Sequence, residues 1–346
     1  MKKYYLLLLM ATFLICTTLK AQDDEIEEST PLSISGSVDT YYKYDFSGNP
    51  NIPTSFASDQ NSFSIGMVNL IASQQVGKAS FVGDISFGPR GQGQSILNSG
   101  ADDNSFHIQN LYVAYQLSDL VTVSAGYMGT FVGYEVISPT GNFNYSTSYL
   151  FTSGPFQNAG LKFDFALSEK FGLMVGVFND WNEYTDMTSS KDIGLQLSYS
   201  PAEGYDLYFN LITGEQSGTE FDITAGLQFT EYFYLGVNAA TYGANEEPKL
   251  LNTAEDTGFY GLAVYPQVKI TDVTSLGFRF EHFVQRDAID DISVDAFTFS
   301  ANIGSGNLKF IPELRYDTAS EDVFADSDNE PTGGAFQLVA AAVYSF

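Results

Sequence analysis

The chain has 346 residues, 42 acidic and 15 basic, and its net charge of −27 argues against a nucleic-acid partner, which requires a basic surface. Charged residues make up only 16% of the chain while aromatic residues reach 15%, so it is neither a disordered acidic chain nor an average soluble domain. The one cysteine, Cys16, lies in an amino-terminal apolar segment. The mature protein is therefore predicted to contain no disulfide and no cysteine metal site.

Residues 1–21 have the pattern of a cleavable secretory signal peptide. Two lysines precede an apolar run from Tyr4 to Cys16, and Ala21 offers a small residue for cleavage. The run is too short to cross a bilayer as a helix. Residues 22–30 (QDDEIEEST) are acidic and unpatterned, and we interpret them as a periplasmic leader.

From residue 31 to residue 346, apolar and polar side chains alternate with a period of two, which is typical of strands with one apolar and one polar face. The alternation changes phase within 61–76 and within 105–117, which indicates a bulge or a less exposed face. About sixteen such segments can be counted, and none has a sustained helical period. The pattern predicts an all-β fold: one transmembrane antiparallel β-barrel of about sixteen strands, porin-like, over residues 31–346.

The connections between these segments alternate in length. Short connections near 77–78, 118–119, 168–170, 200–204, 230–231, 270–273 and 304–307 are separated by connections that are mostly longer. Barrels of the outer membrane have short periplasmic turns and longer external loops, whereas a soluble sandwich has no reason for this alternation. Pro266 and Pro312 fall inside predicted strands, and we expect a bulge at Pro312.

The third long connection, residues 133–158, is rich in aromatic residues and carries one charge, Glu135. A solvated external loop would be more polar, so this loop is expected to pack on protein. It either folds into the barrel and narrows the pore, which we favour, or covers the rim or a neighbouring subunit. The constriction candidates are Tyr134, Phe143, Tyr145, Tyr149, Phe151 and Phe156.

Several charged residues alternate with apolar ones inside predicted strands. Because a charge on the lipid face costs several kcal/mol, these side chains are expected to face the lumen. They either set ion selectivity, with a weak cation preference from the excess of carboxylates, or brace the wall. With Glu135 of the loop, the pore-lining candidates are Glu135, Lys162, Asp164, Arg279, Glu281, Glu313, Arg315 and Asp317.

Catalysis and metal binding have little support. His107 and His282 are the only near-neutral bases, and neither lies near a nucleophile motif. The acidic residues Asp326, Asp328 and Glu330 resemble part of a calcium loop but lack the glycine at its sixth position. We therefore predict no enzyme activity, no metal site and no cofactor.

Short segments of the chain resemble a known family. They are Gly133-Tyr134-Glu135, Asn142-Phe143-Asn144-Tyr145-Ser146, Gly154-Pro155-Phe156, Val177-Phe178-Asn179-Asp180-Trp181, Phe278-Arg279-Phe280-Glu281 and Pro312-Glu313-Leu314-Arg315-Tyr316-Asp317. In this order they resemble the putative β-barrel porin-2 (OmpL-like) outer-membrane proteins over nearly all of the mature chain. The resemblance implies a porin function. The family often carries a basic residue after Tyr-Ser, where this chain has Thr147.

Together these observations predict an outer-membrane porin for passive diffusion of ions and small hydrophilic solutes. The absence of a plug domain before the first strand favours this over an energy-coupled receptor. The alternative is a non-conducting surface protein, an adhesin or a structural anchor. Expected partners are outer-membrane lipid and lipopolysaccharide, and the barrel-insertion machinery, which would recognise the terminal strand 334–346 ending in Phe346. The lipid-facing rows do not distinguish a monomer from a homo-oligomer.

Overall fold

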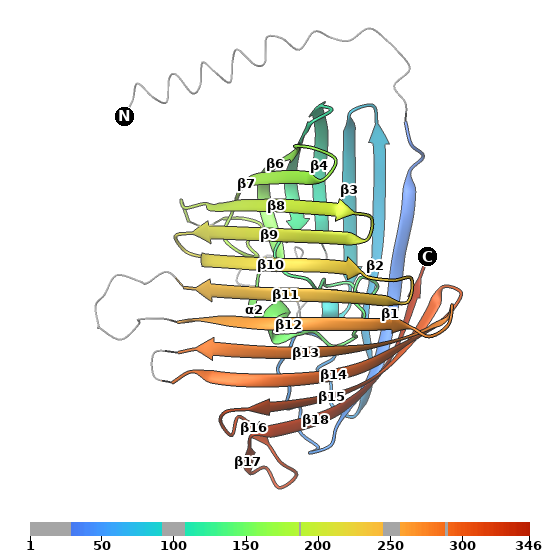
Figure 1. Ribbon diagram of the computed structural model, residues 1–346, viewed down its shortest axis with the longest axis vertical. Coiled ribbons are helices and arrows are strands. Elements are labelled where there is room, and N and C mark those ends of the chain that lie inside the picture. The colour runs from blue at the N-terminus through green and yellow to red at the C-terminus, as the bar shows by residue number, and fades with distance from the viewer. Residues whose placement is uncertain (1–28, 92–107, 187, 245–256, 288–289) are drawn as a thin grey trace, which may run out of the picture.

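The computed structural model describes residues 29–91, 108–186, 188–244, 257–287 and 290–346. Within these residues, sixteen strands form one closed antiparallel barrel, which confirms the predicted fold (Figure 1). Neighbouring strands along the chain pair with each other, and the last strand pairs with the first. The barrel strands are β1 (Ser33–Asp45), β2 (Ser62–Val76), β3 (Ala79–Phe87), β4 (Ile108–Ser118), β5 (Val121–Gly129), β6 (Gln157–Ala166), β7 (Phe171–Phe178), β8 (Asp192–Ala202), β9 (Tyr205–Gly214), β10 (Gly218–Gln228), β11 (Phe233–Gly243), β12 (Gly258–Lys269), β13 (Thr274–Arg286), β14 (Ile292–Ser305), β15 (Leu308–Ala319) and β18 (Gly334–Ser345).

Four short elements lie in the connections. They are the 3₁₀ turn η1 (Pro89–Gly91), the helix α2 (Tyr149–Ser153) and the two-residue strands β16 (Phe324–Ala325) and β17 (Pro331–Thr332), which pair with each other. Across the described ranges, no helix has the length and apolar character needed to cross a membrane.

The connections differ in length at the two ends of the barrel. At one end, here the turn end, seven connections have two to four residues: 77–78, 119–120, 167–170, 203–204, 229–232, 270–273 and 306–307. At the other end, the loop end, the connections are longer except for residues 215–217 between β9 and β10. The predicted alternation is confirmed. The start of β1 and the end of β18 meet at the turn end, where Ser37 pairs with Ser345.

Both segments with a change of phase contain a register shift. On β2, Gly66 and Met67 together oppose the single residue Asp39 of β1. The Met67 amide donates to the Asp39 carboxylate at 2.9 Å, and a Cβ on Gly66 would lie 1.8 Å from the same carboxylate. Gly66 is therefore required here because only hydrogen fits. On β4, Gln109 is the extra residue opposite Asp84 and Ile85 of β3.

The expected bulge at Pro312 is wrong. Pro312 pairs in regular register with Ala340 of β18, and no residue is inserted on its other side, towards β14. Pro266 likewise pairs with Leu235 of β11. A strand residue directs its N–H to only one neighbour, so a proline there loses one ladder bond and leaves the other pairing intact. A closed barrel can therefore accommodate proline without an extra residue.

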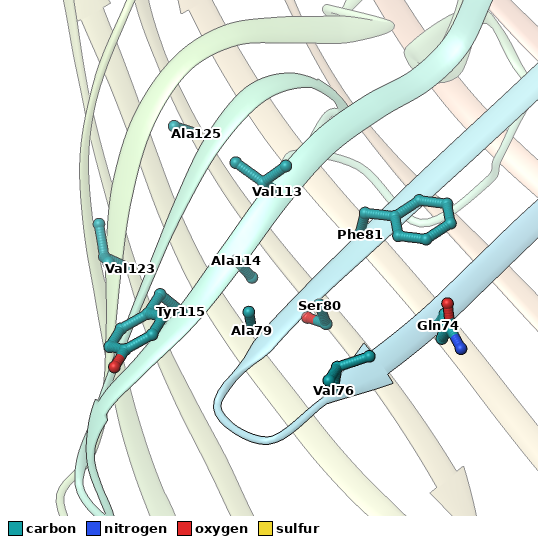
Figure 2. A pocket seen from close by; sticks show the side chains of 10 residues that line it. All are labelled: Gln74, Val76, Ala79, Ser80, Phe81, Val113, Ala114, Tyr115, Val123 and Ala125. Carbon is teal, nitrogen blue, oxygen red and sulfur yellow. The ribbon is translucent and has the colours of Figure 1, made fainter. Parts of the chain in front are cut away.

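The two faces of the wall differ as the alternation predicts. Large apolar side chains such as Phe299 and Leu314 are exposed on the outer face, while their neighbours Thr298 and Glu313 are buried inside. The outer face also carries a hollow of about 430 Å³ near the turn end of β2–β5 (Figure 2). Its walls include the outward-facing side chains of Val76, Ala79, Phe81, Val113, Tyr115, Val123 and Ala125. This hollow belongs to the outer surface and not to the lumen.

Phe299→Lys is expected to destabilise the inserted barrel by about 2–4 kcal/mol, because it places a charge on the outer face near the middle of β14. The same substitution at Ser198, a half-buried inner-face position near the middle of β8, is the control. Urea unfolding in lipid vesicles measures both free energies. Equal losses for the two variants would contradict the assignment of outer and inner faces.

Candidate functional site: a loop pinned inside the barrel

The connection between β5 and β6, residues 130–156, enters the barrel, and we call it the inner loop. Its helix α2 contacts β12 and β13, strands on a different part of the wall from β5 and β6, and is seen behind β11 and β12 in Figure 1. Most residues from 142 to 151 are buried. The predicted aromatic loop therefore lies within the lumen and packs on the wall.

Arg279 of β13 is the most heavily bonded side chain beneath this loop. Its guanidinium donates to Glu135 Oε1 at 2.8 Å and to the Ser146 carbonyl at 2.6 Å. Further bonds of 3.2 Å reach Ser146 Oγ, the Thr147 carbonyl and Thr298 Oγ1. Arg279 is fully buried and Glu135 is 5% exposed, so this ion pair is shielded from lumenal water.

Two wall carboxylates accept main-chain N–H groups of the inner loop. Glu281 accepts from Tyr149 and Leu150, both at 2.8 Å. Glu313 accepts from Tyr145 at 2.9 Å and from Ser146 at 3.2 Å. Charge-assisted bonds of this kind are about twice as strong as neutral ones, so the loop backbone itself is held by the wall.

Arg315 and Asp317 of β15 form a bidentate pair, with both N–O distances between 2.8 and 2.9 Å. Arg315 also donates to the Thr147 carbonyl at 2.8 Å, and Asp317 accepts from the Tyr149 hydroxyl at 2.8 Å. Both charged residues are fully buried. The Thr147 carbonyl thus receives bonds from two arginines, whereas its hydroxyl donates to the Ser55 carbonyl at 2.6 Å.

Tyr145 connects the inner loop to β1. Its hydroxyl donates to Asp39 at 2.5 Å, and Arg90 lies 4.5 Å from its ring centre and 3.6 Å from the Asp39 carboxylate. Arg90 also stacks on Phe56, at 4.3 Å. Burial raises the pKa of the Tyr145 phenol well above its usual value, so this hydroxyl stays protonated and keeps donating.

The first residues of the inner loop bind another part of the wall. The Phe131 carbonyl accepts from Gln196 of β8 at 3.1 Å, and the Gly133 amide donates to Asp222 of β10 at 3.1 Å. Tyr134 stacks on Tyr265 of β12, with ring centres 4.4 Å apart. The loop therefore follows the wall from β8 round to β15 and β1.

Glycines on the inner wall make room for the aromatic side chains. A Cβ on Gly277 of β13 would lie 2.2 Å from the Phe143 ring, and a Cβ on Gly236 of β11 would lie 2.2 Å from the Tyr134 hydroxyl. Phe151 and Phe156 instead pack on each other and on Phe56 from the β1–β2 connection. Tyr149 stacks on Phe283 of β13. All six aromatic candidates therefore have packing partners on the wall or in this cluster.

Gly277→Ala is expected to displace Phe143 and to lower barrel stability by about 1–3 kcal/mol, the usual cost of overpacking. Gly83→Ala on β3 is the control, because a Cβ there would meet nothing within 4 Å. Urea unfolding compares the two variants. A change of the same size in both would show that the substitution acts through strand propensity and not through Phe143.

Lys162 and Asp164 of β6 lie apart from this network. Their side chains are 3.2 Å from each other and 29% and 42% exposed. They are the members of the predicted pore-lining set that remain in contact with lumenal water. Glu135, Arg279, Glu281, Glu313, Arg315 and Asp317 lie between the wall and the inner loop.

Asp39, Asp222, Arg90 and Phe56 were not among the predicted pore-lining or constriction residues. The alternation places Asp39 and Asp222 on the inner face, so this signal was present in the sequence. Arg90 and Phe56 come from connections, where the sequence has no periodic signal that predicts a contact. The predicted bases are not part of this site: His282 bonds Asp295 at 2.7 Å in the outer rows of β13 and β14, and His107 lies outside the described residues.

No group of three or more potential ligands among the described residues could hold a metal ion. In the acidic β15–β18 connection, the Asp326 carboxylate accepts the amides of Asp328 and Glu330, at 2.8 and 2.9 Å. That pattern closes a turn around one carboxylate.

Comparisons with known proteins were made on this framework. None of the curated proteins compared matches the chain. Among solved structures, an anion-selective porin from Comamonas acidovorans is similar, with a TM-score of 0.60 at 12% identity, covering 92% of this chain and 100% of that one. OmpT of Vibrio cholerae gives 0.59 at 12% identity over 94% of this chain and 100% of that one. The outer membrane channel DcaP of Acinetobacter baumannii gives 0.58 at 14% identity, over 92% and 97%.

Identities of 12–14% support likeness of fold alone, and that fold is the porin barrel. The family comparison reaches further, because it matches residues 31–346, the whole predicted barrel segment. The resemblance found in the motifs is confirmed. The chain belongs to the putative beta-barrel porin-2, OmpL-like family.

Proposed function

We propose that this protein is an outer-membrane porin through which ions and small hydrophilic solutes diffuse passively. A barrel of sixteen strands is wide enough for an aqueous channel, which here would be narrowed by the inner loop. The observation that carries the proposal is the pinned loop. Buried charges hold it against β13–β15 and β1, while a cavity of about 190 Å³ separates it from the opposite wall, β2–β6. Family and fold support a channel over an enzyme.

Orientation in the membrane follows from the porin proposal. The turn end faces the periplasm and the loop end faces outward, as in barrels with short periplasmic turns. The signal peptide 1–21 would deliver the chain to the periplasm, where the acidic leader 22–30 would remain. The insertion machinery would recognise β18 and Phe346, and lipid and lipopolysaccharide would surround the outer face. A homo-oligomer is compatible with this arrangement.

One observation favours the competing function, a non-conducting surface protein. The inner loop contacts a wide arc of the wall, from Gly133 with Asp222 at β10 to Tyr145 with Glu313 at β15. A plugged barrel would need such contacts. Planar-bilayer recording of the purified protein separates the two proposals: discrete salt conductance supports the porin, and silence, even after removal of the inner loop, contradicts it.

Most of the carboxylates expected to set ion selectivity lie beneath the inner loop, and Asp84 of β3 lies at the cavity. Its oxygens accept only long bonds of 3.4 Å, from Asn69 and Asn110. We expect a modest preference for K⁺ over Cl⁻, and Asp84→Asn should reduce it without blocking current. Reversal potentials across a KCl gradient measure this, with Asp164→Asn as the control outside the cavity. An unchanged reversal potential in Asp84→Asn would count against the cavity as the ion path.

A further inference from the structure

The cavity between the inner loop and the β2–β6 wall has an unusual polar lining. Its wall side is formed by four carboxamide side chains and one carboxylate: Asn69, Asp84, Gln109, Asn110 and Gln157. They come from the four strands β2, β3, β4 and β6, so the strand order of the barrel and not the local sequence brings them together.

These side chains form two hydrogen-bonded groups. Asn69 and Asn110 each donate to Asp84, and Gln157 donates to Gln109 Oε1 at 3.3 Å. Gln157 is 1% exposed, and its Oε1 has no hydrogen-bond partner in the described part of the chain. A buried acceptor without a partner is costly unless water or a solute donates to it.

The opposite side of the cavity comes from the inner loop and is mostly apolar, although Thr130, Glu135 and Ser138 also line it. It includes Val132, Val136, Ile137, Phe151 and Phe156. The charged residues that line the cavity are Asp84 and Glu135, and Glu135 is bonded to Arg279. Among the described residues that line the cavity there is no lysine or arginine to compensate the charge of a passing anion.

This combination suits one class of solute. Carboxamides both donate and accept, as hydroxyl groups do, so several of them can replace the water around a sugar's hydroxyls. The apolar side can cover the C–H face of the ring. A carboxylate solute would meet Asp84 in a poorly hydrated space, where like charges repel strongly.

We propose that this cavity selects uncharged, hydroxyl-rich solutes of monosaccharide size over their acidic counterparts. The proposal rests on the porin function proposed above. The cavity volume of about 190 Å³ equals roughly six waters at about 30 Å³ each, which is room for one small solute at a time.

Liposome swelling with the purified full-length protein tests this selectivity. D-glucose and sodium D-glucuronate, which share the pyranose ring and differ by a carboxylate at C6, are compared in the same vesicles. We expect glucose to enter at least about tenfold faster, since a mismatch of one buried charge commonly exceeds one decade in rate. Equal entry rates of the two solutes, corrected for their free diffusion, would overturn the proposal.

Gln157→Met keeps the length of the side chain and removes the free acceptor. Glucose entry relative to KCl conductance should fall about fivefold, the effect of one lost hydrogen bond. Gln116→Met is the matched control: Gln116 shares the inner face of β4 with Asn110 but lies six residues, about 20 Å, further towards the turn end. If both variants slow glucose equally, Gln157 has no special role and the proposal fails.

Gln157→Lys adds a cation to the cavity and should raise glucuronate entry relative to glucose. An unchanged ratio would overturn the proposal. The ratio of the two solutes' entry rates through the wild-type protein tests the proposal by itself. The test therefore remains valid even if a variant misfolds. The two proposals also fail differently: lack of any KCl conductance contradicts the porin, whereas conductance with no preference for glucose contradicts only the selectivity.

Discussion

Arg279→Ala is expected to release the inner loop and to raise the single-channel conductance severalfold. The substitution removes five hydrogen bonds, three of them to Ser146 and Thr147 of the loop, and leaves Glu135 buried without its partner. Breaking a buried pair in this way costs about 3–5 kcal/mol. The loop can leave the wall and carry Glu135 into lumenal water. We therefore expect the lost free energy to detach the loop and not to unfold the barrel. Planar-bilayer recording in KCl measures the change.

Two variants test the cause of this effect. Lys162→Met breaks an ion pair that is largely open to water, which is worth about 0–1 kcal/mol, and should leave the conductance close to that of the wild type. Arg279→Met combined with Glu135→Met replaces the buried pair by apolar side chains, which commonly preserves stability. The double variant should return the conductance towards the wild-type value. If it conducts as much as Arg279→Ala, the pair does not hold the loop.

Deletion of residues 141–154, bridged by a short glycine linker, is expected to give the largest conductance of any variant. It removes α2 and the segment bound by Glu281 and Glu313, so the lumen of a sixteen-strand barrel becomes open to water. The wall charges lose their loop partners but gain hydration, so the barrel should still insert. Conductance and heat-modified gel mobility, read together, measure pore size and folding.

A deletion outside the lumen is the control for this experiment. Removing residues 326–329, the tip of the β16–β17 hairpin, shortens a connection at the loop end without touching the inner loop's anchors on the wall. Its conductance should match the wild type. A wild-type conductance in the 141–154 deletion would show that the inner loop does not limit the current.

The alternation of side chains predicted the barrel well, because the outward rows of side chains face lipid and the inward rows face the lumen. Phe299 and Thr298 illustrate this: one residue apart, they are 49% and 0% exposed. The phase changes in β2 and β4 were predicted for the same reason, since an extra residue must reverse the faces. Pro312 was misjudged because the sequence does not reveal to which neighbour its missing N–H would have pointed.

The site was less predictable than the wall. Aromatic composition indicated that residues 133–158 pack on protein, but no local pattern shows that Glu135 meets Arg279, 144 residues away. The charged residues on the inner face were predicted to line the pore. The alternation predicts on which face of the wall a side chain lies, but it does not predict whether another segment covers that side chain. The covering depends on contacts across the closed barrel, such as Tyr145 with Asp39, which form only once the strands are assembled.

The pairing of β1 with β18 has a consequence for assembly. Asp39 and Val343 are partners across this junction, so the barrel closes by a contact that spans almost the whole described chain. Contacts between such distant residues form late, because the chain must lose the most conformational entropy to make them. Tyr145, from the middle of the chain, packs in one cluster with Tyr41, Val339 and Val343 from both sides of the junction. The inner loop thus contacts both strands of the β1–β18 junction. Its docking on the wall would be the last step of folding.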